Sequence, residues 1–139
     1  MLPYELIEHT ADAEFRSYGA TLEEAFANAI TAMCAIVTDP AKAERGREAV
    51  VEVRAFDLKR LLFELLDQAL YLMDTEHFLA VGADNLVIAR RLGRYHLTAT
   101  LYGDDVTKHG GNLKAVTYHD MEVEQRPDGS WMCQAVIDI

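Results

Sequence analysis

The chain has 139 residues, half of them hydrophobic, and 23 acidic against 13 basic side chains give a formal net charge of -10. This length is close to the commonest size of one domain, and apolar residues are spread along it. We therefore predict a single folded domain over residues 1–139 and exclude a disordered chain. The negative charge would repel a phosphate backbone over most of the surface, so direct nucleic-acid binding is not expected.

Cysteine usage and the first residues indicate the compartment. Cys34 and Cys133 each lie in an apolar run, which is typical of small packing residues and not of a disulfide framework. The opening residues show no basic leader followed by an apolar core. No uncharged apolar stretch approaches the roughly 18 residues of a membrane span. We expect a cytoplasmic protein that makes no contact with a membrane.

Two helices are predicted in the first half of the chain. Thr21 and Glu24 form a capping box, and apolar residues at helical spacing follow as far as Asp39-Pro40, where proline removes the next donor. Asp57 is the predicted cap of a second helix that runs to about Asp74. The apolar stripe of this second helix is wide. It is either covered on two sides or offers a surface to a partner, and core burial is the favoured alternative.

Most of the remaining chain has the alternation or the β-branched and aromatic residues of strands. The predicted strands are 48–55, 85–92, 94–101, 115–125 and 131–139, with two more on either side of residues 9–12. Pro127-Asp128-Gly129 predicts a hairpin between the last two strands. The segment 103–112 is richer in glycine and polar residues than a tight turn requires, as functional and mobile loops are. The predicted fold class is α+β, with a mostly antiparallel sheet and two main helices packed on it.

No complete catalytic signature is present. The chain lacks Gly-x-Ser-x-Gly, His-Glu-x-x-His, Cys-x-x-Cys and a phosphate loop. The first of four candidate clusters is His9-Thr10-Ala11-Asp12, which falls at a turn between two predicted strands. An aspartate at such a turn is more often a local cap than a ligand, and a lone histidine is more often a packed polar residue.

The second cluster lies at the end of the sequence. Strand parity places Asp138 on the face opposite Ile137, and the α-carboxylate of Ile139 would lie close to the Asp138 carboxylate. Two solvated carboxylates at a frayed end are the plain alternative. If the last strand pairs near Asp12, three carboxylates converge, which is enough for Ca²⁺ or Mg²⁺. His9 would add a nitrogen ligand that suits a softer metal.

Lys108-His109 and Tyr118-His119-Asp120 are the other two clusters. A strand that begins at Ala115 places His119 on the same face as Met121, so His119 is either a core histidine held by a hydrogen bond or part of a site. Lys108, in an acidic loop, is by itself most often a solvated lysine.

Taken together and in order, several blocks of this chain resemble the archease family, and they span nearly its whole length. The blocks are His9-Thr10-Ala11-Asp12, Tyr18 to Phe26, Leu70 to Glu76, Lys108-His109, Lys114 to His119 and Val136 to Ile139.

The resemblance implies a function and a site. Proteins of this family activate the tRNA-splicing RNA ligase and do not seal RNA themselves. They promote guanylylation of the ligase's active-site histidine and multiple turnover, and they alter its nucleotide triphosphate specificity. The family holds a metal on residues that correspond here to Asp12, Asp138 and Ile139. Lys108, Lys114 and His119 also belong to family motifs, without an assigned role.

The sequence is compatible with more than one metal ion and with more than one class of function. Ca²⁺ suits an all-oxygen site best, and Mg²⁺ or Mn²⁺ are the other candidates. Besides a ligase activator, the sequence is compatible with a metal-dependent phosphoesterase that uses Asp12 and Asp138 as ligands and His119 as general base. A third alternative is a chaperone-like module that docks a client on the wide stripe of the second helix.

Overall fold

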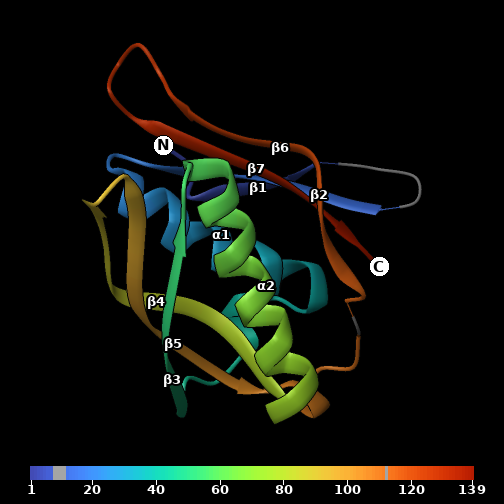
Figure 1. Ribbon diagram of the computed structural model, residues 1–139. Coiled ribbons are helices and arrows are strands. Elements are labelled where there is room, and N and C mark those ends of the chain that lie inside the picture. The colour runs from blue at the N-terminus through green and yellow to red at the C-terminus, as the bar shows by residue number, and fades with distance from the viewer. Residues whose placement is uncertain (8–11, 112) are drawn as a thin grey trace.

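The computed structural model describes residues 1–7, 12–111 and 113–139, and its seven strands form two antiparallel sheets (Figure 1). The four-stranded sheet has the order β1-β2-β7-β6, from Tyr4–Ile7, Asp12–Gly19, Trp131–Asp138 and Ala115–Gln125. The three-stranded sheet has the order β3-β5-β4, from Arg47–Ala55, Arg94–Asp105 and Phe78–Arg91. The predicted α+β class is confirmed, with the strands divided between two sheets.

Both predicted helices begin at the predicted caps. Helix α1 spans Leu22–Val37, and the backbone N–H of Glu24 donates to the Thr21 hydroxyl over 3.1 Å. Helix α2 spans Leu58–Glu76, and the backbone N–H of Arg60 donates to the Asp57 carboxylate over 2.8 Å. Each cap satisfies an amide that has no partner within its own helix, which fixes where the helix starts.

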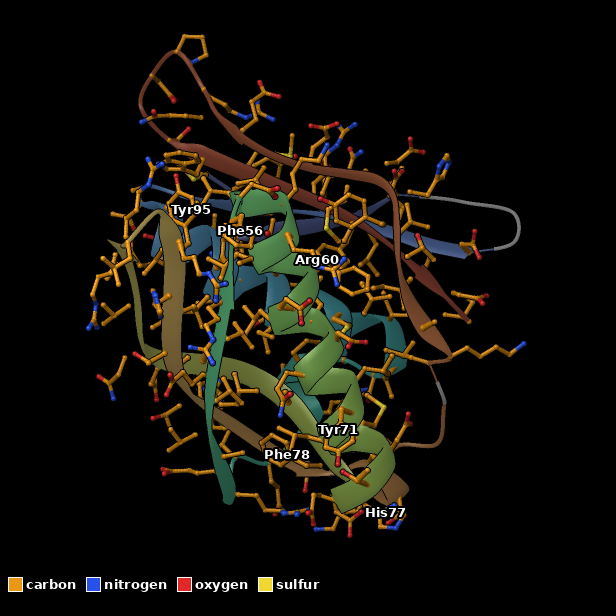
Figure 2. The ribbon with its side chains drawn as sticks, in the orientation of Figure 1. Phe56, Arg60, Tyr71, His77, Phe78 and Tyr95 are labelled. Carbon is orange, nitrogen blue, oxygen red and sulfur yellow. The ribbon has the colours of Figure 1, made fainter. Side chains whose placement is uncertain are left out.

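The core lies between the two sheets, because each helix contacts strands of both. Helix α1 packs on β2 and β4, and α2 packs on β6 and β3. The wide stripe of α2 is therefore covered on two sides, as expected for core burial. Its outer face carries Tyr71, which is 59% exposed and points away from the sheets (Figure 2). The largest fully buried side chains are Phe15, Phe26, Ile30, Leu61, Leu62, Leu65, Leu66, Phe78, Leu79, Leu97, Leu101 and Met121.

Strand β4 begins seven residues before the predicted start at residue 85. His77, in the left-handed conformation with φ 54°, caps the end of α2, and the strand follows at once. The prediction missed this because no glycine or proline separates helix from strand. The segment Phe78–Gly82 is buried throughout, so it shows no alternation.

Both cysteines are buried free thiols, as predicted for packing residues. Burial raises the pKa of Cys34 and of Cys133 to about 12, so neither is a reactive thiolate at neutral pH. Within the described residues, neither helix has the length and apolar character needed to cross a bilayer.

Candidate functional site

Strand β7 brings two of the predicted metal ligands together. It pairs antiparallel with β2, and Asp138 is the register partner of Asp12. Directly opposite residues of two antiparallel strands project from the same face, with Cβ atoms about 5 Å apart. Strands β2 and β7 lie next to each other although they come from opposite ends of the chain (Figure 1), and the register places the Asp12 and Asp138 side chains on the same face.

The end of β7 is held on both sides. On the side away from β2, Asp138 is the register partner of Ala115 in β6, and the backbone N–H of Lys114 donates to the Asp138 carbonyl over 2.8 Å. Asp138 therefore lies in a central strand and not at a frayed end. Ala115 is small, so it leaves space beside the Asp138 side chain on that face.

Two carboxylates are a partial metal site. Among the described residues, no donor hydrogen-bonds the side chain of Asp12 or Asp138, and no three His, Cys, Asp or Glu side chains gather closely enough to hold a metal. The pair offers two hard oxygen donors, which fit Ca²⁺ or Mg²⁺ if further oxygens complete the shell. Ile139, the predicted third ligand, follows directly and is 47% exposed. His9 lies outside the described residues.

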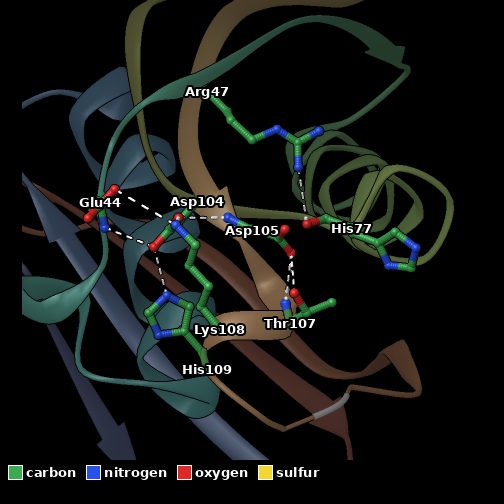
Figure 3. A network of polar contacts seen from close by, with 8 residues as sticks. All are labelled: Glu44, Arg47, His77, Asp104, Asp105, Thr107, Lys108 and His109. Atoms are coloured by element: carbon green, nitrogen blue, oxygen red, sulfur yellow. Dashed lines mark hydrogen bonds and ion pairs between the residues drawn. The ribbon is translucent and has the colours of Figure 1, made fainter.

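Another carboxylate, that of Asp104, lies near the end of β5 among several polar side chains (Figure 3). It is only 5% exposed. Its Oδ2 lies 2.8 Å from Nε2 of His109 and accepts from the backbone N–H of Glu44 over 3.0 Å. Its Oδ1 accepts from the backbone N–H of Asp105 over 2.8 Å and lies 3.7 Å from Nζ of Lys108. We call Glu44, Asp104, Lys108 and His109 the Asp104 network.

Hydrogen bonding controls the charge of Asp104. The His109 contact, followed by the Glu44 amide, holds the pKa of this carboxyl well below its ordinary value of 3.8, although burial acts in the opposite direction. Asp104 is therefore ionised at every physiological pH, and its charge is satisfied by the protein itself.

Lys108 and His109 belong to the Asp104 network, and the segment 103–112 contains more regular structure than the predicted loop. Strand β5 continues to Asp105, and a 3₁₀ turn, η2, spans Val106–Lys108. The His109 side chain is only 10% exposed, whereas that of Lys108 is 57% exposed and lies 3.9 Å from a Glu44 carboxylate oxygen. His109 is thus a largely covered partner of Asp104, and Lys108 lies at the surface beside it.

His119 is not a core histidine, so that alternative is wrong. Its side chain is 80% exposed and lies 3.2 Å from the Asp120 carboxylate. The pairing of β6 with β7 is irregular between Thr117 and Glu122, and Asp120 has a φ of 55°. This irregularity breaks the strand parity on which the prediction rested. Lys114 is exposed and contributes its backbone N–H, as described above.

Glu44 was not singled out from the sequence, and Asp104 was noted only as an acidic residue of the polar loop 103–112, although its side chain is buried. Their hydrogen bond joins residues 60 positions apart, and neither belongs to a spaced motif. An aspartate just before a turn with a histidine five residues later was the one available signal.

Comparison with known proteins identifies the family. The model of the Archease protein family matches residues 4–139. The protein archease of Pyrococcus furiosus is 42% identical over 143 positions that cover 100% of both chains. That of Pyrobaculum neutrophilum is also 42% identical and covers 98% of this chain and 95% of its own.

Solved structures agree with the sequence comparisons. The solution structure of protein 1598 of Methanobacterium thermoautotrophicum matches with a TM-score of 0.82 and 33% identity, covering 99% of each chain. A Thermotoga maritima crystal structure, described as an archease and possible chaperone, shares the fold with a TM-score of 0.55 at 18% identity, over 96% of this chain and 94% of its own. Since the family model and the relatives extend over nearly the whole sequence, this chain belongs to the Archease family.

Proposed function

We propose that this protein binds a divalent cation at Asp12, Asp138 and the α-carboxylate of Ile139, and that the loaded protein activates the tRNA-splicing RNA ligase. The observation that carries the proposal is the register pairing of Asp12 with Asp138. Two carboxylates on one face repel each other unless a cation lies between them. The resemblance of the flanking blocks to the archease family supports the same three ligands.

The chemistry of the donor atoms limits which metal ion the site would bind. An all-oxygen set of carboxylates favours Ca²⁺, with Mg²⁺ and Mn²⁺ as the alternatives, and water would complete the coordination shell. Bound there, the ion supplies positive charge on an otherwise acidic surface. Asp12 and Asp138 hold it at the end of a sheet whose central strand is hydrogen-bonded on both sides, so the donors are pre-positioned.

The partner is inferred from the family. Family resemblance supports a role in which this protein promotes guanylylation of the ligase, sustains its multiple turnover and alters its nucleotide triphosphate specificity. The protein acts here as an accessory factor and not as the RNA-sealing enzyme.

The other two function classes have less support. A phosphoesterase would need His119 as a base beside the metal. His119 lies four residues along β6 from Ala115, the register partner of Asp138, which corresponds to about 13 Å at strand spacing. A chaperone-like module would dock a client on the apolar stripe of α2, but the core residues of that stripe are buried against both sheets.

An RNA-ligation assay tests the proposal. Purified ligase would be given RNA with a 2′,3′-cyclic phosphate end and a 5′-hydroxyl end, guanosine triphosphate and limiting Mn²⁺, with and without this protein. We expect more than one turnover per ligase and faster ligase guanylylation only when this protein is present. RNA consumption by this protein alone would support a phosphoesterase, and unchanged ligase turnover would contradict the proposal.

A further inference from the structure

A groove lies at the start of α2, away from the carboxylate pair. It encloses about 500 Å³, which is within the size range of small-molecule sites. Its apolar lining comes from four elements or their ends: Phe56, Leu58, Tyr95, Tyr118 and Val123. Val123 is the register partner of Cys133, which is five residues, or about 17 Å, along β7 from Asp138. The groove is therefore separate from the proposed metal site.

Three aromatic rings of the groove are each in cation–π contact with a basic side chain. The Arg94 guanidinium lies 4.6 Å from the centre of the Phe56 ring, and that of Arg90 lies 5.3 Å from the centre of the Tyr95 ring. Lys59 Nζ lies 6.0 Å from the centre of the Tyr118 ring. Figure 2 shows Phe56 and Tyr95 close together at one end of α2. Phe56 is 69% exposed and Tyr118 is 43% exposed, so both rings keep surface for a ligand.

The charge of the groove is opposite to that of the whole protein. Within the described residues, no carboxylate lies within ion-pair distance of Lys59, Arg90 or Arg94, whereas neighbouring Arg60 is paired with Glu64 over 2.9 Å. The single acidic lining residue, Asp57, accepts the Arg60 backbone N–H as the helix cap. A cleft with one sign of charge concentrates ligands of the opposite sign.

We propose that this groove binds a nucleoside phosphate. The base would stack on the exposed Phe56 and Tyr118 rings, and the phosphates would contact Lys59, Arg90 and Arg94. Stacking on aromatic side chains next to basic groups is the usual way in which proteins hold unpaired nucleotides. An inorganic anion would leave the rings unused, and an apolar peptide would bury the cations without a partner. The net charge of -10 opposes a long polyanion, which favours a single nucleotide.

Amide NMR of the isolated protein tests this inference. Guanosine triphosphate, guanosine and inorganic phosphate would each be titrated in the presence of a chelator, so that no metal bridges a phosphate to Asp12 or Asp138. We expect the nucleotide to shift the amides of residues 56–59 and 90–95, and to bind at least tenfold more tightly than guanosine or phosphate alone. No shift at millimolar nucleotide would overturn the proposal.

Substitutions assign the contacts. Phe56→Ala, and Arg90→Gln combined with Arg94→Gln, should each weaken binding about tenfold. The matched controls Tyr71→Ala and Lys42→Gln alter an exposed ring and an exposed cation elsewhere, and should leave affinity unchanged. Thermal unfolding checks that every variant folds. Equal loss of affinity in the controls would contradict the assignment.

Two further ligands identify the source of the nucleotide. A single-stranded oligonucleotide that binds no better than the mononucleotide would assign a free nucleotide, and a tighter one would assign a strand end. Either result supports the proposal. A glutamate-rich peptide that outcompetes both would replace it with a protein partner. Because these measurements use the protein alone, their failure would leave ligase activation untouched.

Discussion

Asp104 and Asp138 both lie near the end of a strand, but the protein surrounds their carboxylates differently. Asp104 is buried and is contacted by His109, Lys108 and two backbone amides. Asp138 is half-buried and faces a second carboxylate, that of Asp12, with no hydrogen-bond donor to either side chain among the described residues.

This difference distinguishes a charge that the fold itself satisfies from one that remains available to a ligand. A buried carboxylate with a full set of protein donors stabilises the fold and has little capacity left for a ligand. Two facing carboxylates without donors repel each other, and a bound cation would relieve that repulsion. Exposure and hydrogen-bond partners, and not the presence of aspartate alone, therefore favour the Asp12–Asp138 pair over Asp104 as the proposed metal site.

Extending the chain beyond Ile139 should have the largest effect. An added peptide converts the α-carboxylate into a neutral amide and places bulk beside Asp12 and Asp138, so we expect ligase activation to be lost. Multiple-turnover ligation with a C-terminally tagged protein measures this, and an N-terminally tagged protein is the control. Full activation by the C-terminally tagged form at normal metal concentration would remove Ile139 from the site.

Replacing the charge of Asp104 should affect the fold and not the metal. Asp104→Asn removes an ionised acceptor from His109 and the Glu44 amide, so we expect the free energy of unfolding to fall by about 2 kcal/mol. Urea denaturation measures it, and metal affinity by calorimetry should stay the same. Asp67→Asn, on the exposed face of α2, is the matched control. A large loss of metal affinity in Asp104→Asn would show that the two regions are coupled.

Asp138→Asn should give the reverse pattern. One charged donor becomes neutral, so we expect metal affinity to fall at least tenfold, equivalent to about 1.4 kcal/mol, while stability in the absence of metal stays the same or rises. The rise would come from relief of the repulsion with Asp12. Calorimetric titration with Ca²⁺, Mg²⁺ and Mn²⁺ decides the point. Unchanged affinity for all three metals would exclude Asp138 as a ligand.

Acid should produce the smallest effect. The folded-state pKa of Asp104 is held below its ordinary value of 3.8, so its stabilising contribution is complete above about pH 5 and is lost as pH falls through that folded-state pKa. Urea unfolding between pH 5 and pH 2 should therefore show a steeper loss in the parent protein than in Asp104→Asn. Parallel curves for the two proteins would mean that Asp104 contributes no pH dependence.

Local signals predicted the elements well. Thr21 and Asp57 cap their helices with the expected hydrogen bonds, and the turn after Gln125 joins β6 to β7. These features depend on contacts between residues only a few positions apart. A capping oxygen or a turn glycine therefore carries its own structural information.

Errors arose where strand alternation is interrupted. The pairing of β4 with β5 shifts register twice, and Asn85, with a φ of 53°, lies at the second shift. Asp120, with a φ of 55°, lies at the irregularity in β6, and the neighbouring His119 side chain is exposed to solvent. Neither residue is a glycine, so no residue type marked the places where extra residues, one in β4 and three in β6, interrupt the period of two.

Of the long-range contacts in the two acidic regions, one was predicted from the sequence and the other was not. Strand parity at the C-terminus, combined with the family blocks, anticipated that Asp138 approaches Asp12, and the register bears this out. The Asp104 network was not predicted, because the hydrogen bond that Asp104 accepts comes from the backbone N–H of Glu44, in a loop in the first half of the chain. Parity constrains a side chain within a strand, and it says nothing about which distant backbone amide will meet it.

The two sheets also differ in how the chain must assemble them. The β3-β5-β4 sheet is made entirely from residues 47–105, whereas the β1-β2-β7-β6 sheet joins both ends of the chain through the pairing of β2 with β7. Closing so long a loop is entropically costly and slows folding, so the β3-β5-β4 sheet should form first. Asp12 and Asp138 meet only at that final closure. A metal bound by both residues would hold β2 and β7 together and slow their separation. The unfolding rate of the protein would then depend on whether the cation is bound.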